Sequence, residues 1–287
     1  MPSRPIRRKA RHTPAKGKPS RKIETDKHVL YEKAVQSPDA EVDFIDKVFR
    51  RLRGRKPSHL REDFCGTAAC CCAFVRRRPG NTAVGLDLHQ PTLDWGTRHN
   101  VAALPEASRS RVTLLRRNVL KSGPGTSGVD AVVAMNFSWW VFHTRELLLD
   151  YFGGVRRSLA RDGLFFLDIY GGWESMKELR EKRQIGGKKR GFTYIWDQER
   201  FDPINNRTRC HIDFKLRGGR TIKRAFTYDW RLWTIPEARD VLRDAGFRTV
   251  TVYWEGDDGR GSGNGVFRPA KVGECCHTFI AYIVAEP

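Results

Sequence analysis

Helix-like and strand-like patterns of apolar residues alternate along most of the chain. Val42, Ile45, Val48 and Phe49 recur at helical spacing, which predicts an amphipathic helix over about 40–53. The same reading predicts further helices at 68–75, 91–103, 144–160 and 235–247. Strands are predicted at 59–61, 82–88, 111–115, 129–135, 164–170, 248–256 and 276–285.

Strands separated by helices of this length form parallel sheets, because each helix must cross back over the sheet. The pattern therefore predicts an α/β protein with a doubly wound, mostly parallel, seven-stranded Rossmann-like sheet. Arg161-Asp162-Gly163 is expected to turn the chain into the fifth strand, and a long glycine-rich loop is expected at 257–274.

Residues 171–230 do not follow this alternation of strands and helices. They contain FTYIWDQERF, TRCHIDFKL and TIKRAFTYDW, in which polar and aromatic residues alternate between glycine pairs. Alternation of this kind is typical of antiparallel strands with one exposed face. We expect a β-rich insertion or lid after the fifth strand.

The length and composition indicate the size of the domain and the cellular compartment of the protein. A chain of 287 residues with 39% hydrophobic residues is long enough for one large domain, here expected at 28–287. No apolar run of 18 residues and no signal-peptide pattern occurs. The seven cysteines are odd in number and clustered, which favours reduced thiols and a cytoplasmic protein.

The net charge of +20 is unevenly distributed, since nine of the excess charges fall within residues 1–22. We expect residues 1–27 to form a disordered basic tail, because so polar a segment cannot bury enough surface to fold. Such a tail can grip nucleic-acid phosphates, or it can be a solvated arm without a dedicated partner.

Candidate ligand-binding residues follow the predicted strands. LREDFCGTA (60–68) places Gly66 just after the first strand, where the backbone can approach a ligand and the next helix offers free N–H groups. Asp87 ends the second strand, where a carboxylate can accept both ribose hydroxyls. Asn118 follows the third strand and MNFSWW (135–140) the fourth, so all four positions share one edge of the sheet.

These motifs, in this order, resemble those of class I S-adenosylmethionine-dependent methyltransferases. Glu62 to Ala68 resembles the family's acidic-x-Gly-x-Gly-x-Gly motif, with Phe64 and Ala68 in place of the first and third glycines. GLDL (85–88) resembles the ribose-binding motif, and Asn118 stands where the family has an acid on the adenine side. LREDFCGTA, VQSPDAEVDF and GNGVFRP also resemble a methyltransferase-domain group of unassigned substrate.

The resemblance implies S-adenosylmethionine as cofactor and a set of residues that bind it. That set is Glu62, Phe64, Cys65, Gly66, Thr67, Asp87, Leu88, Asn118, Val119, Asn136, Phe137 and Tyr31. Tyr31 belongs to HVLYEKAVQ (28–36), which either folds over the cofactor or connects the tail to the first helix as a surface segment.

The clustered cysteines suggest a metal site, but their spacing argues against one. Cys70, Cys71 and Cys72 would point in different directions on one helix, and no Cys-x-x-Cys pair is available. Small buried packing residues are the better account, and Cys275-Cys276-His277 is likewise expected to pack in a strand. No metal site is predicted.

Catalytic residues are harder to recognise, because methyl transfer requires alignment more than acid–base chemistry. The predicted catalytic residues are Asn136, His143 and Tyr170, with Ser138, Tyr228 and His211 as further candidates; each can instead serve packing or orient the substrate. Several tryptophans either line an aromatic acceptor pocket, suited to an amine or a methylated ammonium, or simply pack the core. The members of this set are Trp139, Trp140, Trp173, Trp196, Trp230, Trp233 and Trp254.

Three functions therefore stay open. The first is N- or O-methylation of a small-molecule or peptide acceptor by in-line displacement, and it is the one we predict. The second is methylation of nucleic acid, which the basic tail and the loose likeness of Asn136 to Trp139 to a base-methylating motif favour. The third is a non-catalytic protein of the same fold. No membrane partner is expected, and the sequence does not fix the oligomeric state.

Overall fold

The computed structural model describes residues 25–187, 191–259 and 262–287. The basic tail at 1–22 therefore lies outside the described residues. The first helix, α1 (Lys27–Ala34), begins where Asp26 accepts a hydrogen bond from the His28 backbone N–H, which is the usual N-cap arrangement.

Within the described residues, the core is an eight-stranded sheet in the order β11-β10-β12-β5-β4-β1-β2-β3. Neighbours from β5 to β3 pair in parallel, whereas β12, β10 and β11 pair antiparallel. Its strands are β1 (His59–Asp63), β2 (Thr82–Asp87), β3 (Val112–Arg116), β4 (Val129–Ala134), β5 (Leu159–Gly171), β10 (Thr249–Asp257), β11 (Gly263–Pro269) and β12 (Phe279–Glu286).

All seven predicted strands are present, and the predicted doubly wound sheet is confirmed. The eighth strand, β11, lies in the stretch predicted as a loop. Gly263 and Gly265 give this segment little strand propensity of its own. Pairing with the edge of β10 holds it in the sheet, a tertiary effect that local sequence does not reveal.

The predicted turn at 161–163 is also different in the structure. β5 already begins at Leu159, and its register with β4 shifts between Leu159 and Leu164. The Arg161-Asp162-Gly163 segment is thus an irregularity within a longer strand rather than a break before it.

Helices cover both faces of the sheet, and two separate hydrophobic clusters fill the two layers. On one face lie α2 (Pro38–Arg53) and α3 (Ala69–Arg77), and on the other α6 (Arg145–Ser158) and α7 (Ile235–Asp244). Near β3 lie α4 (Gln90–Gly96), the π-helix Thr97–Val101 and α5 (Glu106–Arg109), and short 3-10 turns span Val119–Lys121, Ser138–Val141 and Trp173–Met176.

Local sequence explains where these helices begin and end. Helix α7 starts with a capping box, in which Thr234 accepts from the Glu237 backbone and the Glu237 side chain accepts from Thr234. Helix α2 ends at Gly54, whose φ of 73° is left-handed and therefore favours glycine.

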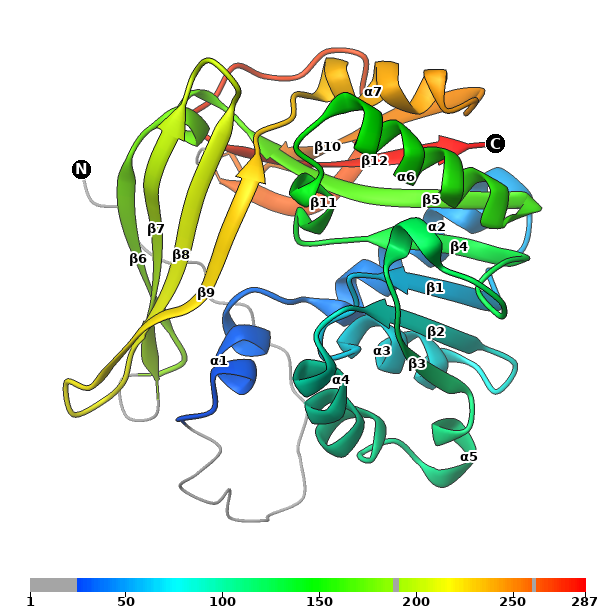
Figure 1. The fold of residues 1–287 in the computed structure, drawn as a ribbon, viewed down its shortest axis with the longest axis horizontal. Helices are drawn as coiled ribbons and strands as arrows, with labels where there is room; N and C mark the ends of the chain where they lie inside the picture. The colour runs from blue at the N-terminus through cyan, green and yellow to red at the C-terminus, as the bar shows by residue number, and fades with distance from the viewer. Residues whose placement is uncertain (1–24, 188–190, 260–261) are drawn as a thin grey trace.

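The predicted insertion is a separate four-stranded antiparallel sheet in the order β6-β7-β8-β9. Its strands are β6 (Leu179–Ile185), β7 (Phe192–Asp202), β8 (Arg207–Lys215) and β9 (Thr221–Arg231). Figure 1 shows this small sheet standing at one end of the large sheet, with α1 close to β9. It faces the edge at which the parallel strands β1, β2 and β4 end.

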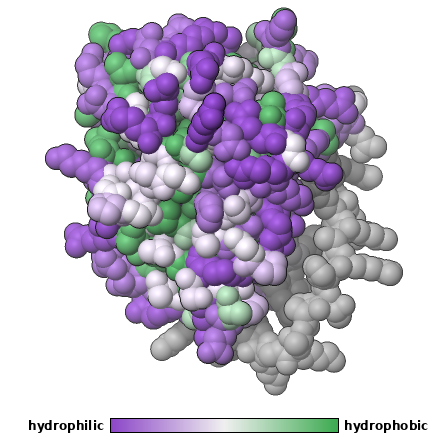
Figure 2. Space-filling model, turned by 90° about the vertical axis from the view of Figure 1, so that its right-hand side faces the viewer, coloured by the Kyte–Doolittle hydropathy of each residue, from purple (hydrophilic) through white to green (hydrophobic). Residues whose placement is uncertain are grey.

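The opposite end of the molecule has a different surface. Figure 2 shows this side to be mostly hydrophilic, with only a narrow hydrophobic band. No helix in the described part of the chain is both long and apolar enough to cross a bilayer.

Candidate active site

The loop after β1 has an unusual backbone. Phe64, Gly66 and Ala68 all have left-handed φ angles, of 57°, 51° and 60°. These are the three positions at which the methyltransferase motif has glycines, so the loop keeps the glycine conformation with other residues at two of them. Left-handed backbone is costly for residues with a Cβ, which means that the surrounding contacts must hold it.

Asp87 ties this loop to the end of β2. Its carboxylate accepts from the Gly66 backbone N–H at 2.9 Å and from the His89 backbone N–H at 2.8 Å. Each carboxylate oxygen keeps a further lone pair for a ligand hydroxyl. Beside it Leu88 is 61% exposed, which is unusual for a leucine directly after a buried strand. The pair fits a ribose and an adenine face.

Glu62 and Cys65, two further residues of the predicted cofactor-binding set, contact the elements that flank the loop. The Glu62 carboxylate accepts from the Cys71 backbone N–H at 2.9 Å, at the start of α3. Cys65 is buried and packs so closely on Gly85 that a Cβ there would meet its sulfur at 2.8 Å. Cys65 thus packs against β2, and Glu62 caps the start of α3.

Thr67 links the loop to α1, a connection that sequence reasoning missed. Its hydroxyl donates to Glu32 at 2.6 Å, and the Asn100 amide donates to Glu32 at 2.7 Å and to the Thr67 carbonyl at 2.9 Å. On its other side α1 packs on the small sheet, where the Tyr31 and Phe226 rings are 4.7 Å apart. Segment 28–36 therefore lies over the loop and is not a free surface connector.

Asn118 and Val119 have local roles at the end of β3. The Asn118 side chain accepts from the Leu120 backbone N–H at 2.9 Å and caps a short 3-10 turn, and Val119 is buried in the core. This places the Asn118 backbone beside the ends of β2 and β3, while its side-chain oxygen is already in use.

A cavity of about 840 Å³ lies between the small sheet and the ends of β4, β5 and β12. Among the predicted site residues, Tyr31, Asn136, Phe137, Tyr170 and Tyr228 line it. The residues of the Gly66 loop and Asp87 are not among its lining residues. The structure thus separates the predicted set into a loop region at β1 to β3 and a cavity at β4 and β5.

Eight of the 21 residues that line the cavity are aromatic. Tyr228 and Trp230 are stacked with ring centroids 4.3 Å apart, and Trp196 lies within 6.3 Å of both. Phe137 packs edge-on against Tyr170 at 4.8 Å. The aromatic-pocket interpretation therefore holds for Trp196 and Trp230.

Other tryptophans of the predicted set belong elsewhere. Trp139 and Trp233 are fully buried in the core, whereas Trp173 is 45% exposed. Trp140 is also buried, 4.7 Å from Tyr170 between ring centroids. Trp254 packs against Phe279 on β12.

Tyr170, which lines the cavity, and Trp140, which packs against Tyr170 but does not line it, both have unused hydrogen-bonding capacity. The Tyr170 hydroxyl is buried without a partner among the described residues, as is the indole N–H of Trp140. The Asn136 amide lines the cavity and makes no side-chain hydrogen bond within the described part of the chain. Because buried polar groups are normally paired, the Tyr170 hydroxyl marks a place where a polar ligand would bind.

The backbone at Asn136 and Phe137 is held by Asp168, which the sequence analysis did not single out. The two Asp168 oxygens accept from the Asn136 and Phe137 N–H groups at 2.8 and 2.9 Å. The sequence does contain a signal for this role. Asp168 is an acid inside the apolar run LFFLDIY (164–170), and a buried carboxylate needs hydrogen-bond partners.

Two predicted catalytic histidines are not in the cavity. His143 bonds through Nε2 to the Asp229 carbonyl oxygen at 2.8 Å and does not line it. His211 is buried between Thr227 at 2.8 Å and Glu199 at 3.0 Å, and does not line it either. The prediction of His143 as a catalytic residue is therefore not supported by its position.

Ser138 is also absent from the cavity lining. Its hydroxyl donates to the Met135 carbonyl at 2.8 Å, which stabilises the turn after β4. Of the predicted catalytic residues and the further candidates, the fold brings Asn136, Tyr170 and Tyr228 together at the cavity.

The cysteines behave as packing residues where they lie on α3. Cys70, Cys71 and Cys72 are buried free thiols. Cys275 and Cys276 differ from the prediction, because β12 begins only at Phe279 and both lie in the preceding loop, with Cys275 exposed. Within the described residues, no three His, Cys, Asp or Glu side chains are grouped so as to hold a metal ion.

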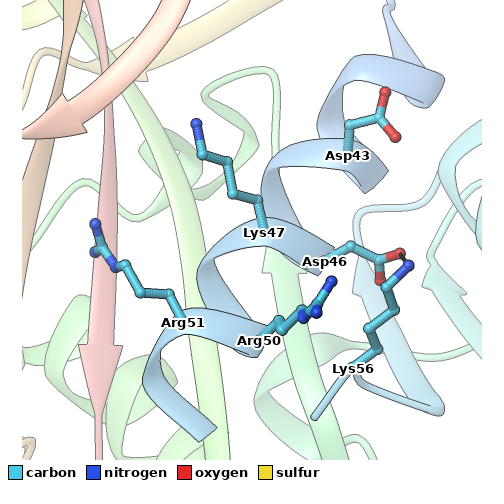
Figure 3. A pocket seen from close by; sticks show the side chains of 6 residues that line it. All are labelled: Asp43, Asp46, Lys47, Arg50, Arg51 and Lys56. Carbon is cyan, nitrogen blue, oxygen red and sulfur yellow. Dashed lines mark ion pairs between the residues drawn. The ribbon is translucent and has the colours of Figure 1, made fainter. Parts of the chain in front are cut away.

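A second hollow, of about 500 Å³, lies on the outer side of α2 and is lined entirely by charged residues. Figure 3 shows that Lys47 and Arg51 point to one side of the helix while Asp46 meets Lys56 on the other. Its side chains therefore do not converge on one ligand position.

The sequence matches no protein-family model and no curated protein, whereas solved structures match over nearly the whole chain. DesVI from Streptomyces venezuelae is 19% identical with a TM-score of 0.66, covering 91% of this chain and 96% of its own. CalS10, an amino pentose methyltransferase from Micromonospora echinaspora solved with bound S-adenosylmethionine, is 18% identical with a TM-score of 0.63, at 89% and 95% coverage.

A third structure extends over the full chain. KedS8, a sugar N-methyltransferase from a Streptoalloteichus species, is 16% identical with a TM-score of 0.61, covering 99% of this chain and 100% of its own. The chain has the fold of S-adenosylmethionine-dependent methyltransferases, which confirms the fold that the motifs imply. The similarity includes the small sheet, because the coverage leaves no room for a missing insertion of that size.

Burial of Glu62 predicts an unusual pH dependence of stability. Desolvation raises the pKa of Glu62 from 4.5 to about 8. The folded protein then keeps a proton that the unfolded chain releases, so this contribution is complete below pH 4.5 and is lost as pH rises towards 8. We expect Glu62→Gln to be more stable than the wild type at pH 8 by about 3 kcal/mol, and equal to it at pH 4.5.

Urea unfolding of the cofactor-free protein between pH 4.5 and 8 measures this difference. Glu106→Gln, at an exposed position on α5, is the matched control and is expected to follow the wild-type curve. Parallel curves for wild type and Glu62→Gln would show that Glu62 is ionised in the folded protein at neutral pH.

Proposed function

We propose that the protein is an S-adenosylmethionine-dependent methyltransferase that methylates an amine nitrogen of a small-molecule acceptor. The observation that carries this is the cavity of about 840 Å³ at the ends of β4 and β5, which α1 connects to the loop at Gly66, because Tyr31 lines the cavity and Glu32 accepts from Thr67 in the loop. Ligand cavities of this size accept molecules larger than a single sugar ring. The sugar N-methyltransferase KedS8 and the amino pentose methyltransferase CalS10 share the fold, which supports an amine acceptor.

The loop region fits the cofactor. Asp87 has free lone pairs for the ribose hydroxyls, the exposed Leu88 side chain offers an apolar face to the adenine, and Gly66 presents backbone to the ligand. When bound there, S-adenosylmethionine supplies an electrophilic methyl group. The chain's own contribution is to orient the acceptor and to exclude water.

Asn136 and Tyr170 are suited to orient an amine. An amine nitrogen has N–H bonds and one lone pair, so acceptors that bind the N–H groups fix the direction of the lone pair. The side-chain amide oxygen of Asn136 and the unpartnered Tyr170 hydroxyl are such acceptors in the cavity. Alignment of this kind supplies much of the acceleration in a displacement reaction.

Among the described residues that line the cavity, Tyr170 and Tyr31 are poor general bases near neutral pH. Burial raises the pKa of Tyr170 well above its usual value and that of Tyr31 to about 12. Among the described lining residues, the charged ones are Glu181, Lys182, Arg183 and Glu255, on β6 and β10 rather than at the strand ends with Asn136 and Tyr170. The acceptor amine therefore enters as the free base and needs no deprotonation by the protein.

Transfer of a labelled methyl group to a panel of acceptors tests the proposal. The panel contains an amino-sugar glycoside, an arylalkylamine, a lysine-containing peptide and a single-stranded RNA. We expect transfer to a small amine. Transfer to RNA alone would favour the nucleic-acid function, and no transfer together with no cofactor binding would leave a non-catalytic protein.

Trp196 offers a sharper test of the cavity. We expect Trp196→Leu to lower kcat/KM for the best amine about tenfold, because the change removes an aromatic face that contacts the acceptor or its methylated product. Trp173→Leu, at an exposed tryptophan that does not line the cavity, is the control. Equal effects of the two changes would place the acceptor elsewhere.

A further inference from the structure

We propose that Asp168 is a positioning residue that fixes the turn formed by Asn136 and Phe137 and thereby determines how the acceptor binds. The link to the acceptor rests on the proposed function, whereas the hold on the turn can be tested without it. Asp168 lies near the end of β5 and is not itself among the residues that line the cavity.

Both hydrogen bonds of the Asp168 side chain go to the turn after β4. Its two carboxylate oxygens accept from two consecutive backbone N–H groups, those of Asn136 and Phe137, at 2.8 and 2.9 Å. Its carbonyl oxygen accepts from the Trp139 indole at 2.8 Å. With only 8% of its surface exposed, Asp168 makes these bonds largely out of water, where they are strong.

The turn needs such a partner because its backbone is strained. Asn136 and Phe137 both have a φ of 58°, and neither is glycine. Asparagine tolerates this conformation, but phenylalanine adopts it rarely. Successive N–H groups in such a turn point towards the same place and form a concavity suited to an anion, which the carboxylate occupies. A carboxylate accepts both bonds, whereas an amide would oppose one N–H with its own NH₂ group.

The consequence is the placement of two cavity side chains. Asn136 and Phe137 line the cavity, and the Phe137 ring lies 4.8 Å from Tyr170 and 6.3 Å from Trp230 between centroids. If the turn relaxed to ordinary backbone, both side chains would leave these positions. Asp168 thus acts on the acceptor through Asn136 and Phe137.

The test compares Asp168→Asn with Asp130→Asn. Asp130 is a carboxylate of similarly low exposure that also accepts two backbone N–H groups, from Ser58 and His59, but it lies at the other end of β4 and pairs with Arg55 as well. Hydrogen–deuterium exchange of residues 135–140 is expected to become at least tenfold faster in Asp168→Asn and to stay unchanged in Asp130→Asn. Unchanged exchange in Asp168→Asn would overturn the hold on the turn.

The kinetic arm uses the amine with the highest rate in the acceptor panel. We expect Asp168→Asn to raise KM for that amine at least tenfold while the Kd of S-adenosylhomocysteine changes less than threefold. A purely structural role would move both values, or would give the same result in Asp130→Asn, and either outcome overturns the positioning role. If no amine reacts, the proposed function fails, and the exchange measurement still decides whether Asp168 holds the turn.

Discussion

Asp87→Ala is expected to weaken S-adenosylmethionine binding by about a hundredfold, or close to 3 kcal/mol. The carboxylate has one role in the structure and a second one in the proposed cofactor site. It accepts from the Gly66 and His89 backbone N–H groups, which holds the loop after β1 against β2, and it offers lone pairs to a ribose. Alanine removes both, and it leaves two N–H groups without their charged partner.

Calorimetric titration of S-adenosylmethionine and S-adenosylhomocysteine into each variant measures the effect. Asp94→Ala removes an exposed carboxylate on the adjacent α4 and is expected to bind like the wild type. Asp87→Asn keeps one acceptor and should fall between the two. Wild-type affinity in a folded Asp87→Ala would remove the loop region from the cofactor site.

Asp63→Ala is expected to lower the free energy of unfolding by about 3–5 kcal/mol, because it leaves a buried cation unpaired. Arg61 is fully buried and donates to the two Asp63 oxygens at 2.7 and 3.0 Å. Tyr151 donates to the same carboxylate at 2.9 Å, and Ser158 accepts from Arg61 at 3.0 Å. This network supports the end of β1 directly before the loop at Phe64.

Urea unfolding measures this loss of stability, and two further variants serve as comparisons. Asp244→Ala breaks the half-exposed ion pair with Arg145 and is expected to cost less than about 1 kcal/mol. The double variant Arg61→Leu with Asp63→Leu removes both charges and should recover much of the lost stability. A cost below 1 kcal/mol for Asp63→Ala alone would mean that water reaches Arg61.

Repeating local patterns made the fold predictable from sequence. The strands β2, β4 and β5 contain buried apolar runs bounded by turn residues, and helices α2 and α6 between the strands or before them have one apolar face. Residues that end such strands share one edge of the sheet, so Gly66 and Asp87 could be placed together before their contact was seen.

Residues whose role depends on distant partners were not predictable in the same way. Asp168 and His211 are both polar residues within strands, yet one holds the turn at Asn136 and the other lies away from the cavity. Trp196 and Trp139 look alike in sequence, but the first lines the cavity and the second is in the core. The contact of Glu32 with Thr67 joins residues 35 positions apart, which no local spacing encodes.

The sequence by itself determined the alternation of strands and helices, the ligand edge of the sheet and the buried state of Cys70 to Cys72. These follow from hydrophobic periodicity and turn chemistry, which act over a few residues. Only the tertiary structure decided which aromatic side chains enclose the cavity, that β11 joins the sheet, and that Asp168 holds the turn at Asn136 and Phe137. These features arise where separate segments meet, and their energies belong to pairs of residues far apart in the chain.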